Sequence, residues 1–421
     1  MSYDLERPRG LLGYMLAFEG VRDAVTVLHA PTGCKQYPAD FSEKAFRSRD
    51  GGFAVRNLFN FEKEYFFFQP RIPCTYLDGD TFVSGAEERL KDLYDLIVNK
   101  RPGLIGVINT PGASLIGEDL TKLSSDIPTA VCESPGYSHS LSEGFQDAAI
   151  NIIRTLCRDK STERKGVCIF GMSICQHHWE DSLNEIKRML ALCGIDVIAT
   201  VCAGSSAEEI ARIPSSELNI VIHSEYGERA AEYCKECFGT DYVCGLPFGF
   251  DAIHDWITEV CGRLGKDPTP ALEDLDCWRR RSAMCMSKLD TSFIHVSGKT
   301  FSIDGDGSMV ERITDFLYSY LGMIPVAVSS LDKDVAERVR GRFADKGIPV
   351  NDSVWDEEAD VCLASGNTVS SLKSRCVIHD GIDISEPSRM HVSITDEPLI
   401  GTMGTVILMQ KVLDIVARIV K

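Results

Sequence analysis

Two cysteines in the amino-terminal third stand where a chain could bind a metal cluster. Cys34 ends the segment LHAPTGC, in which an apolar run typical of a strand leads into a glycine-containing turn. Such a turn presents the sulfur together with free backbone N–H groups, which stabilise a thiolate. Cys74, in RIPCTYLDGD, follows Pro73 and precedes a turn polar enough for an interface. Both are candidate metal-binding thiolates, and the alternative is that each is a small buried hydrophobic residue.

Other residues capable of chemistry follow later in the chain. His139 and Glu143 are spaced by one helical turn, so they could share a face and shuttle protons. Cys175, His177 and His178 gather in GMSICQHHWED, but their spacing matches no standard zinc pattern.

A C-x-x-C pair, Cys234 and Cys237, lies inside an amphipathic stretch. It lacks the strand, turn and helix that surround a redox motif, so we interpret it as structural.

Composition restricts the class of protein. The 421 residues exceed what one hydrophobic core usually organises, which favours two or three domains. The formal net charge is −18 and no long Lys/Arg run occurs, which argues against a nucleic-acid partner. No apolar stretch approaches 18 residues and the first ten residues are too charged for a secretory signal, so we expect a cytoplasmic chain outside the membrane. Sixteen cysteines in a reducing compartment suggest metal chemistry or an anaerobic host, with most of them buried.

The order of apolar runs predicts an α/β fold. From about residue 20, short β-branched runs alternate with amphipathic stretches, which is typical of parallel sheets covered by helices. A charged run near 158–165 and a Gly/Pro cluster near 262–277 mark boundaries. We therefore predict three Rossmann-like, doubly wound domains, at residues 1–160, 161–285 and 286–421, with ligand-facing loops at the carboxyl ends of the strands.

Nucleotide-binding motifs are missing from this pattern. No strand is followed by G-x-G-x-x-G or by a Walker lysine, and DGDGSM is too short a glycine pattern to count. Any ATP is therefore expected to be used by a partner.

Across nearly its whole length the chain resembles the nitrogenase component 1 family. The family includes the molybdenum–iron protein, cofactor scaffolds, dark-operative tetrapyrrole reductases and a cyclase of coenzyme F430 synthesis. The resemblance lies in LHAPTGCKQYP, NTPGASLIGEDL, CESPGYSHSLSEGF, NIVIHSEYGERAAEYCKECFG and RMHVSITDEPLIG. It implies three Rossmann-like domains around a central cleft.

The resemblance also implies cluster ligands. Cys34 matches a cysteine that binds the family's electron-relay cluster at a subunit interface, and Cys74 is the expected second ligand. Two other ligand positions differ: one falls at Pro8 or Arg9, and Pro111 stands in the third cluster loop. Two thiolates per chain could still bind a [4Fe–4S] cluster if a second, identical or homologous subunit supplied two more.

A second set of matches concerns the cleft. His223 stands where nitrogenase has the cysteine that binds one end of its iron–molybdenum cofactor, and His391 matches the histidine at the other end. His139 falls at a glutamine near that cofactor and Glu143 at a proposed proton-delivering histidine. Imidazole suits iron, so the histidine pair is a chemically reasonable cofactor-binding site.

These matches imply a multi-electron reductase. An ATP-hydrolysing Fe protein would deliver electrons to the interface cluster, and a metal cofactor in the cleft would reduce the substrate. One alternative is a tetrapyrrole reductase of the dark-operative type, with a porphyrinoid in the cleft. The other is a non-catalytic scaffold on which a complex iron–sulfur cofactor is assembled.

Overall fold

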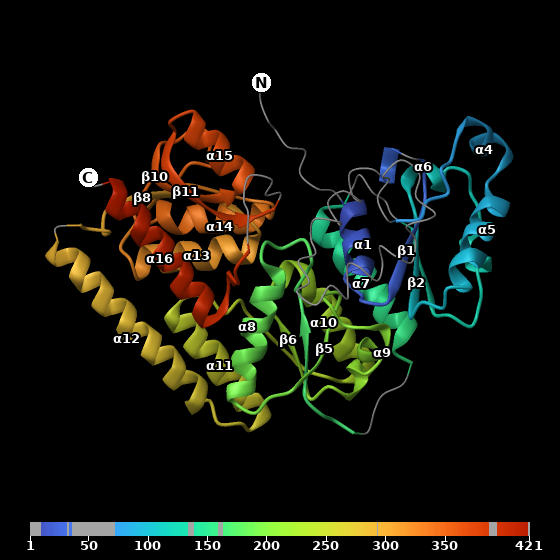
Figure 1. Ribbon diagram of the computed structural model, residues 1–421, viewed down its shortest axis with the longest axis horizontal. Coiled ribbons are helices and arrows are strands. Elements are labelled where there is room, and N and C mark those ends of the chain that lie inside the picture. Colours follow the sequence, from blue (N-terminus) through green and yellow to red (C-terminus); the bar gives the residue numbers. More distant parts are fainter. Residues whose placement is uncertain are drawn as a thin grey trace. The chain divides into compact units, whose positions relative to one another are not determined.

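The structure, a computed structural model, describes residues 10–31, 33–35, 72–133, 139–158, 163–292, 294–386 and 394–419. Its strands form three sheets, with helices between successive strands (Figure 1). The strand pairs with a defined register are parallel in all three sheets. The predicted α/β fold with three parallel sheets is confirmed.

The first sheet belongs to the amino-terminal part of the chain. It has the order β1-β2-β3, with β1 at Ala24–His29, β2 at Leu104–Asn109 and β3 at Thr129–Glu133. Every residue of β1 and β2 is buried, as expected for a parallel sheet covered on both faces. Their valines and isoleucines pack against Tyr94 and its neighbours on α5 (Glu87–Val98).

Two helices of this part pack unusually closely. They are α1 (Gly10–Glu19) and α7 (Leu141–Leu156), which Figure 1 shows side by side. A Cβ added to Gly144 of α7 would lie 2.2 Å from the carbonyl oxygen of Gly10. No side chain larger than hydrogen fits there unless the helices move apart.

The second sheet has the order β5-β4-β6-β7. Its strands are β4 (Val167–Phe170), β5 (Val197–Thr200), β6 (Leu218–Val221) and β7 (Tyr242–Cys244). The helices of this stretch of chain are α8 (Trp179–Leu192), α9 (Ala207–Ile210) and α10 (Ser224–Phe238). All residues of β4 and β6, the two central strands, are buried.

The third sheet has the order β11-β10-β8-β9. Its strands are β8 (Thr300–Gly305), β9 (Ile324–Ser330), β10 (Ala359–Ser365) and β11 (Ile378–Ser385). Its helices are α13 (Gly307–Ser319), α14 (Lys333–Ala344), α15 (Gly366–Ser374) and α16 (Gly401–Ile419). Buried residues of β9, β10 and α15, among them Cys362 and Leu372, form one hydrophobic cluster.

The remaining elements are α4 (Gly79–Ser84), α6 (Pro111–Ser114), α11 (Phe250–Leu264), α12 (Thr269–Thr291) and two 3₁₀ turns at Leu120–Lys122 and Ile213–Ser215. Within the described ranges, no helix has the length and apolar character that crossing a bilayer requires.

Contacts group the chain into two compact units. Unit 1 comprises Met1–Cys175, Val197–Val221 and Tyr226–Tyr242, and unit 2 comprises Gln176–Asp196, Ile222–Glu225 and Val243–Lys421. The predicted division into three domains, with boundaries after residues 160 and 285, stays a prediction.

Candidate functional site

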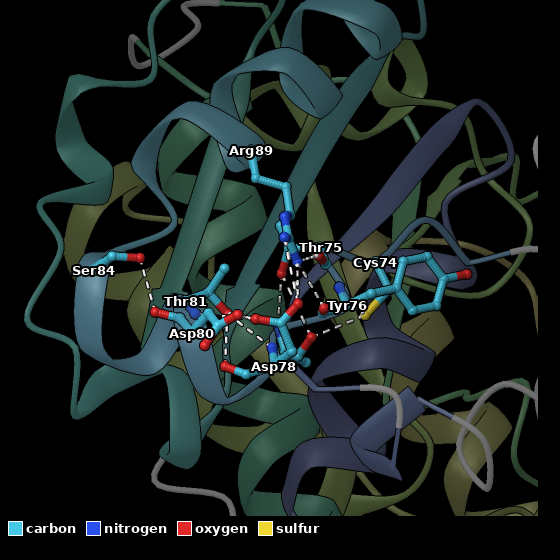
Figure 2. Close-up of polar contacts among 9 residues, drawn as sticks. Cys74, Thr75, Tyr76, Asp78, Asp80, Thr81, Ser84 and Arg89 are labelled. Atoms are coloured by element: carbon cyan, nitrogen blue, oxygen red, sulfur yellow. Dashed lines mark hydrogen bonds and ion pairs between the residues drawn. The ribbon is translucent and has the colours of Figure 1, made fainter.

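The two candidate cluster cysteines both lie at the carboxyl end of β1. Cys34 follows β1 in a short helical turn, and Cys74 forms a parallel bridge with Leu28 of β1. The Cys74 thiol donates a hydrogen bond to the carbonyl oxygen of Ala30 (3.2 Å) and accepts one from the backbone N–H of Tyr76 (3.5 Å), as Figure 2 shows for Tyr76. The fold thus brings together two thiols that are 40 residues apart in sequence.

A buried cation accompanies these thiols. Burial raises the pKa of Cys74, the backbone N–H of Tyr76 and the charge of Lys35 lower it, and the nearby Cys34 raises it again. Burial also raises the pKa of Cys34, while a hydrogen bond with the Thr110 side chain lowers it. Lys35 is 1% exposed, and its Nζ donates to the Tyr76 hydroxyl at 2.8 Å. The charge of Lys35 thus opposes the effect of burial on Cys74 and favours its thiolate, the form that binds metals.

The loop after Cys74 is fixed by its own sequence. Asp78 caps α4, and its carboxylate accepts the backbone N–H of Thr81 while the Thr81 hydroxyl accepts that of Asp78. The backbone N–H and the hydroxyl of Thr81, which both donate to the carboxylate, lower the pKa of Asp78. Arg89 of α5 reaches over the loop and donates to the carbonyl oxygen of Tyr76 at 2.9 Å (Figure 2). The loop after Cys74 is therefore held by the cap of α4 and by Arg89 of α5.

A buried contact between a histidine and a carboxylate at the end of β1 was missed by the sequence analysis. His29 is fully buried, and its Nε2 lies 2.8 Å from Oε2 of Glu118. Burial lowers the pKa of His29, and Glu118 acts against this effect. Glu118 also accepts the backbone N–H of Ala86, the residue before α5. The only signal in the sequence was a polar residue at the end of an apolar strand, directly before the glycine turn.

The predicted proton-transfer residues lie at the start of α7. The Glu143 carboxylate accepts the backbone N–H of Ser140 at 2.7 Å in a capping box, and this bond lowers the pKa of Glu143. His139 instead has its Nδ1 3.3 Å from Oδ2 of Asp147, one further turn along α7. The structure therefore gives His139 a carboxylate partner that the sequence analysis did not name. The catalytic roles of His139 and Glu143 stay predictions.

Asp147 connects His139 to a cavity in unit 1. The Tyr14 hydroxyl donates to Oδ2 of Asp147 at 3.0 Å, and Arg229 donates to Oδ1 at 2.7 Å. The cavity has a volume of about 490 Å³, and its walls include Tyr14, Asp147, Arg229 and Glu133. Burial, followed by the charge of Asp147, raises the pKa of Tyr14. A cavity of this size with converging polar groups is typical of a small-molecule site.

His223 lies in unit 2, two residues beyond the end of β6. It is 3% exposed, and its Nδ1 lies 2.8 Å from the hydroxyl oxygen of Ser308. Burial lowers the pKa of His223 to about 3, so the imidazole is neutral at pH 7. Its predicted counterpart, His391, lies outside the described residues. The histidine pair therefore stays a prediction.

The rival histidines of unit 2 are held by carboxylates. His177 has Nδ1 2.9 Å from Glu386 and Nε2 3.5 Å from Asp383. His178 has Nδ1 3.2 Å from Asp181, and the two imidazole rings meet edge to face at 4.2 Å. In the part of the chain that the structure describes, no group of three or more His, Cys, Asp or Glu residues could bind a metal ion by itself.

Comparison with known proteins decides the family. The family model for nitrogenase component 1 type oxidoreductases matches residues 10–416. The chain belongs to this family. Its resemblance to the nitrogenase component 1 family, predicted from the segments around Cys34, Pro111, His139, His223 and His391, is confirmed.

Its curated relatives include tetrapyrrole-reductase subunits. The chain is 26% identical over 275 residues to a subunit of the light-independent protochlorophyllide reductase of Synechococcus sp. (strain CC9311), covering 62% of this chain and 51% of the relative. It is 27% identical over 305 residues to the corresponding subunit of Prochlorococcus marinus (strain MIT 9515), covering 66% and 56%. The matched part thus spans about half the length of these relatives.

The fold also matches a solved component 1 structure. The structure "Nitrogenase Cp1 at pH 6.5" superposes with a TM-score of 0.79 at 15% identity, covering 100% of this chain and 94% of the other. At this identity the match concerns the fold alone.

Within the component 1 family, the donor set of this member is small. Cys34 and Cys74 adjoin each other beside buried Lys35, which fits two ligands of an iron–sulfur cluster. Pro111 begins α6 and offers no ligand, and Pro8 and Arg9 lie outside the described residues. If both thiols bind a cluster, they would supply half of the usual four thiolates.

The remaining cysteines behave as predicted. All sixteen are free, and most are buried. Cys234 is buried and Cys237 half-buried on α10, and burial raises the pKa of Cys234.

Proposed function

We propose that this chain is a subunit of a two-component, nitrogenase-like reductase that acts on a tetrapyrrole. The proposal is carried by one observation: Cys34 and Cys74 lie near enough to interact at the carboxyl end of β1, and buried Lys35 interacts with Cys74, in a component 1 fold. The tetrapyrrole is favoured over a metal cofactor because relatives of the chain are light-independent protochlorophyllide reductase subunits.

Cys34 and Cys74 would together hold half of a [4Fe–4S] cluster, with two ligands from an identical or homologous second subunit. The cluster would supply single electrons. The chain's own contribution is to keep the two sulfurs near each other, to favour the thiolate of Cys74 through Lys35, and to hold the Cys74 loop through Arg89.

The electrons would come from a separate, ATP-hydrolysing Fe protein. The chain shows no nucleotide-binding motif of its own, so ATP use is assigned to that partner.

Reduction also needs protons, and unit 1 has groups suited to supply them. His139 and Tyr14 both contact Asp147, and Tyr14 and Asp147 line the 490 Å³ cavity. A histidine paired with a carboxylate can donate a proton and recover it from solvent. We assign this role to His139, with Asp147 as its partner, and Glu143 as the helix cap that orients this turn of α7.

The decisive experiment compares cysteine variants of the protein purified without oxygen. The native protein should contain iron and sulfide and show the electron paramagnetic resonance of a reduced cluster. Cys34→Ser and Cys74→Ser should each lose most of the iron, whereas Cys285→Ser, an exposed cysteine on α12, should keep it. Iron content that is equal in all four proteins would refute the assignment.

Substrate binding is tested separately, by adding protochlorophyllide to the same proteins. Binding should shift the Soret band in the native protein. Turnover should require both the Fe protein and ATP.

A metal-cofactor reductase remains the second candidate, because His223 is a buried, neutral imidazole of the kind that binds iron. It predicts iron beyond four atoms per dimer, or molybdenum or vanadium, and loss of that metal in His223 and His391 variants. A cofactor-assembly scaffold would show the same metal but no turnover with the Fe protein.

A further inference from the structure

The start of α13 is capped by a carboxylate from a distant segment. This start is the DGDGSM segment, and the side chain of Asp306, the residue before the helix, makes no capping hydrogen bond. Instead, Oε1 of Glu225 accepts the backbone N–H of Ser308 at 3.1 Å and the Ser308 hydroxyl at 3.0 Å. A Cβ at position 307 would lie 3.0 Å from that of Asp332, which is a tight contact that glycine avoids. A carboxylate at a helix amino terminus is favoured by the helix dipole.

The same hydroxyl contacts His223. The Ser308 oxygen lies 2.8 Å from Nδ1 of His223, and all three residues belong to unit 2. A serine hydroxyl has one hydrogen to donate. Oε1 of Glu225 accepts the backbone N–H of Ser308 at the positive end of α13 and receives the hydroxyl hydrogen as well.

The direction of the remaining hydrogen bond follows. Since the Ser308 hydrogen points to Glu225, its oxygen must accept from His223, and Nδ1 must carry a hydrogen. At 3% exposure the imidazole is buried, which disfavours the doubly protonated cation. Nε2 therefore holds the lone pair. The bond made by one ring nitrogen sets the state of the other.

We propose that Ser308 and Glu225 are positioning residues that fix the Nδ1–H tautomer of His223 and present its Nε2 lone pair to a metal centre. The inference rests on the proposed function. The metal centre is either iron of a bound cofactor or the central metal of a metallotetrapyrrole, and a neutral imidazole nitrogen can bind both. DGDGSM thereby gains a role that its short glycine pattern did not suggest.

The tautomer can be read by ¹⁵N nuclear magnetic resonance of the metal-free protein labelled at histidine. The native protein should show His223 with a protonated Nδ1. Ser308→Ala and Glu225→Ala should both shift the population toward Nε2–H, because either change removes the constraint on the hydroxyl. Ser308→Thr keeps a hydroxyl and should keep the native tautomer.

The control is Ser365→Ala, which removes the hydroxyl that caps α15 but does not touch His223. It should lower stability without changing the tautomer. A native His223 protonated at Nε2, or a tautomer that is the same in native protein and Ser308→Ala, would overturn the inference.

Two probes then test the metal centre: ferrous iron, and zinc protoporphyrin IX. One of these probes should shift or broaden the Nε2 resonance of His223 in the native protein and in Ser308→Thr. The same probe should bind at least tenfold more weakly to Ser308→Ala. A response to iron identifies a cofactor, and a response to the porphyrin identifies a metallotetrapyrrole. If neither probe affects Nε2, the metal-centre part is refuted, whereas the iron–sulfur proposal is tested independently through Cys34 and Cys74.

Discussion

Replacing Gly144 by alanine tests the contact that places the start of α7. The added Cβ would lie 2.2 Å from the carbonyl oxygen of Gly10 on α1, where ordinary contact begins at 3.4 Å. The obstacle is backbone, which cannot rotate away. The two helices would have to separate by about 1.2 Å, the difference between these distances. The backbone N–H of Gly10 also donates to the carbonyl oxygen of His139 at 2.9 Å, so His139 would be displaced as well.

Whether Gly144→Ala raises or lowers the free energy of unfolding shows whether helix propensity or packing dominates. Without a steric conflict, alanine in place of glycine stabilises a helix by roughly 0.5–1 kcal/mol. Forcing extra atoms into a packed contact typically costs about 1–3 kcal/mol. We therefore expect Gly144→Ala to lower the free energy of unfolding by about 1–2 kcal/mol.

Urea denaturation followed by circular dichroism measures this change. The matched control is Gly341→Ala on α14, where an added Cβ meets nothing within 4 Å. The control should be as stable as the native protein or up to about 1 kcal/mol more stable. If Gly144→Ala were also as stable as the native protein, the close crossing of α1 and α7 would be wrong.

Three further predictions concern buried titratable groups. His223 has a pKa of about 3 in the folded protein and about 6.5 in the unfolded chain. The free energy of unfolding, measured in urea, should therefore fall by about 2 kcal/mol from pH 7 to pH 5. His223→Gln should remove this pH dependence of about 2 kcal/mol. Lys35→Met should raise the pKa of Cys74 and slow its alkylation by iodoacetamide in metal-free protein at pH 8, with exposed Cys285 unchanged in the same mass spectra. Glu118→Gln removes the carboxylate that faces buried His29 and should lower the free energy of unfolding by about 1–3 kcal/mol in urea. An unchanged midpoint would contradict a stabilising contact.

The fold class was predictable because its signals are local. Apolar runs such as those of β1 and β2 are buried on both faces, so their sequence is continuously hydrophobic and marks a parallel sheet. The glycine turn before Cys34 could be predicted for a similar reason, because it too depends on neighbouring residues. Family segments then indicated Cys34 and Cys74, and the structure places the two side by side.

Contacts between distant segments were not predictable in this way. Helical spacing paired His139 with Glu143, but Glu143 is engaged by the backbone of Ser140, and His139 contacts Asp147 two turns along. Spacing defines a helix face, whereas capping competes for the side chains on its first turn.

The sequence by itself determined the alternation of strands and helices, the glycine turn and the supply of thiols and imidazoles, because each depends on neighbouring residues. Only the tertiary structure decided which groups meet: Lys35 beside Cys74, Glu118 against His29, and Ser308 between His223 and Glu225. The last pair of contacts spans more than 80 residues. A hydrogen bond requires atoms to approach within about 3 Å. That proximity is set by how whole elements pack, which the sequence around each residue does not record.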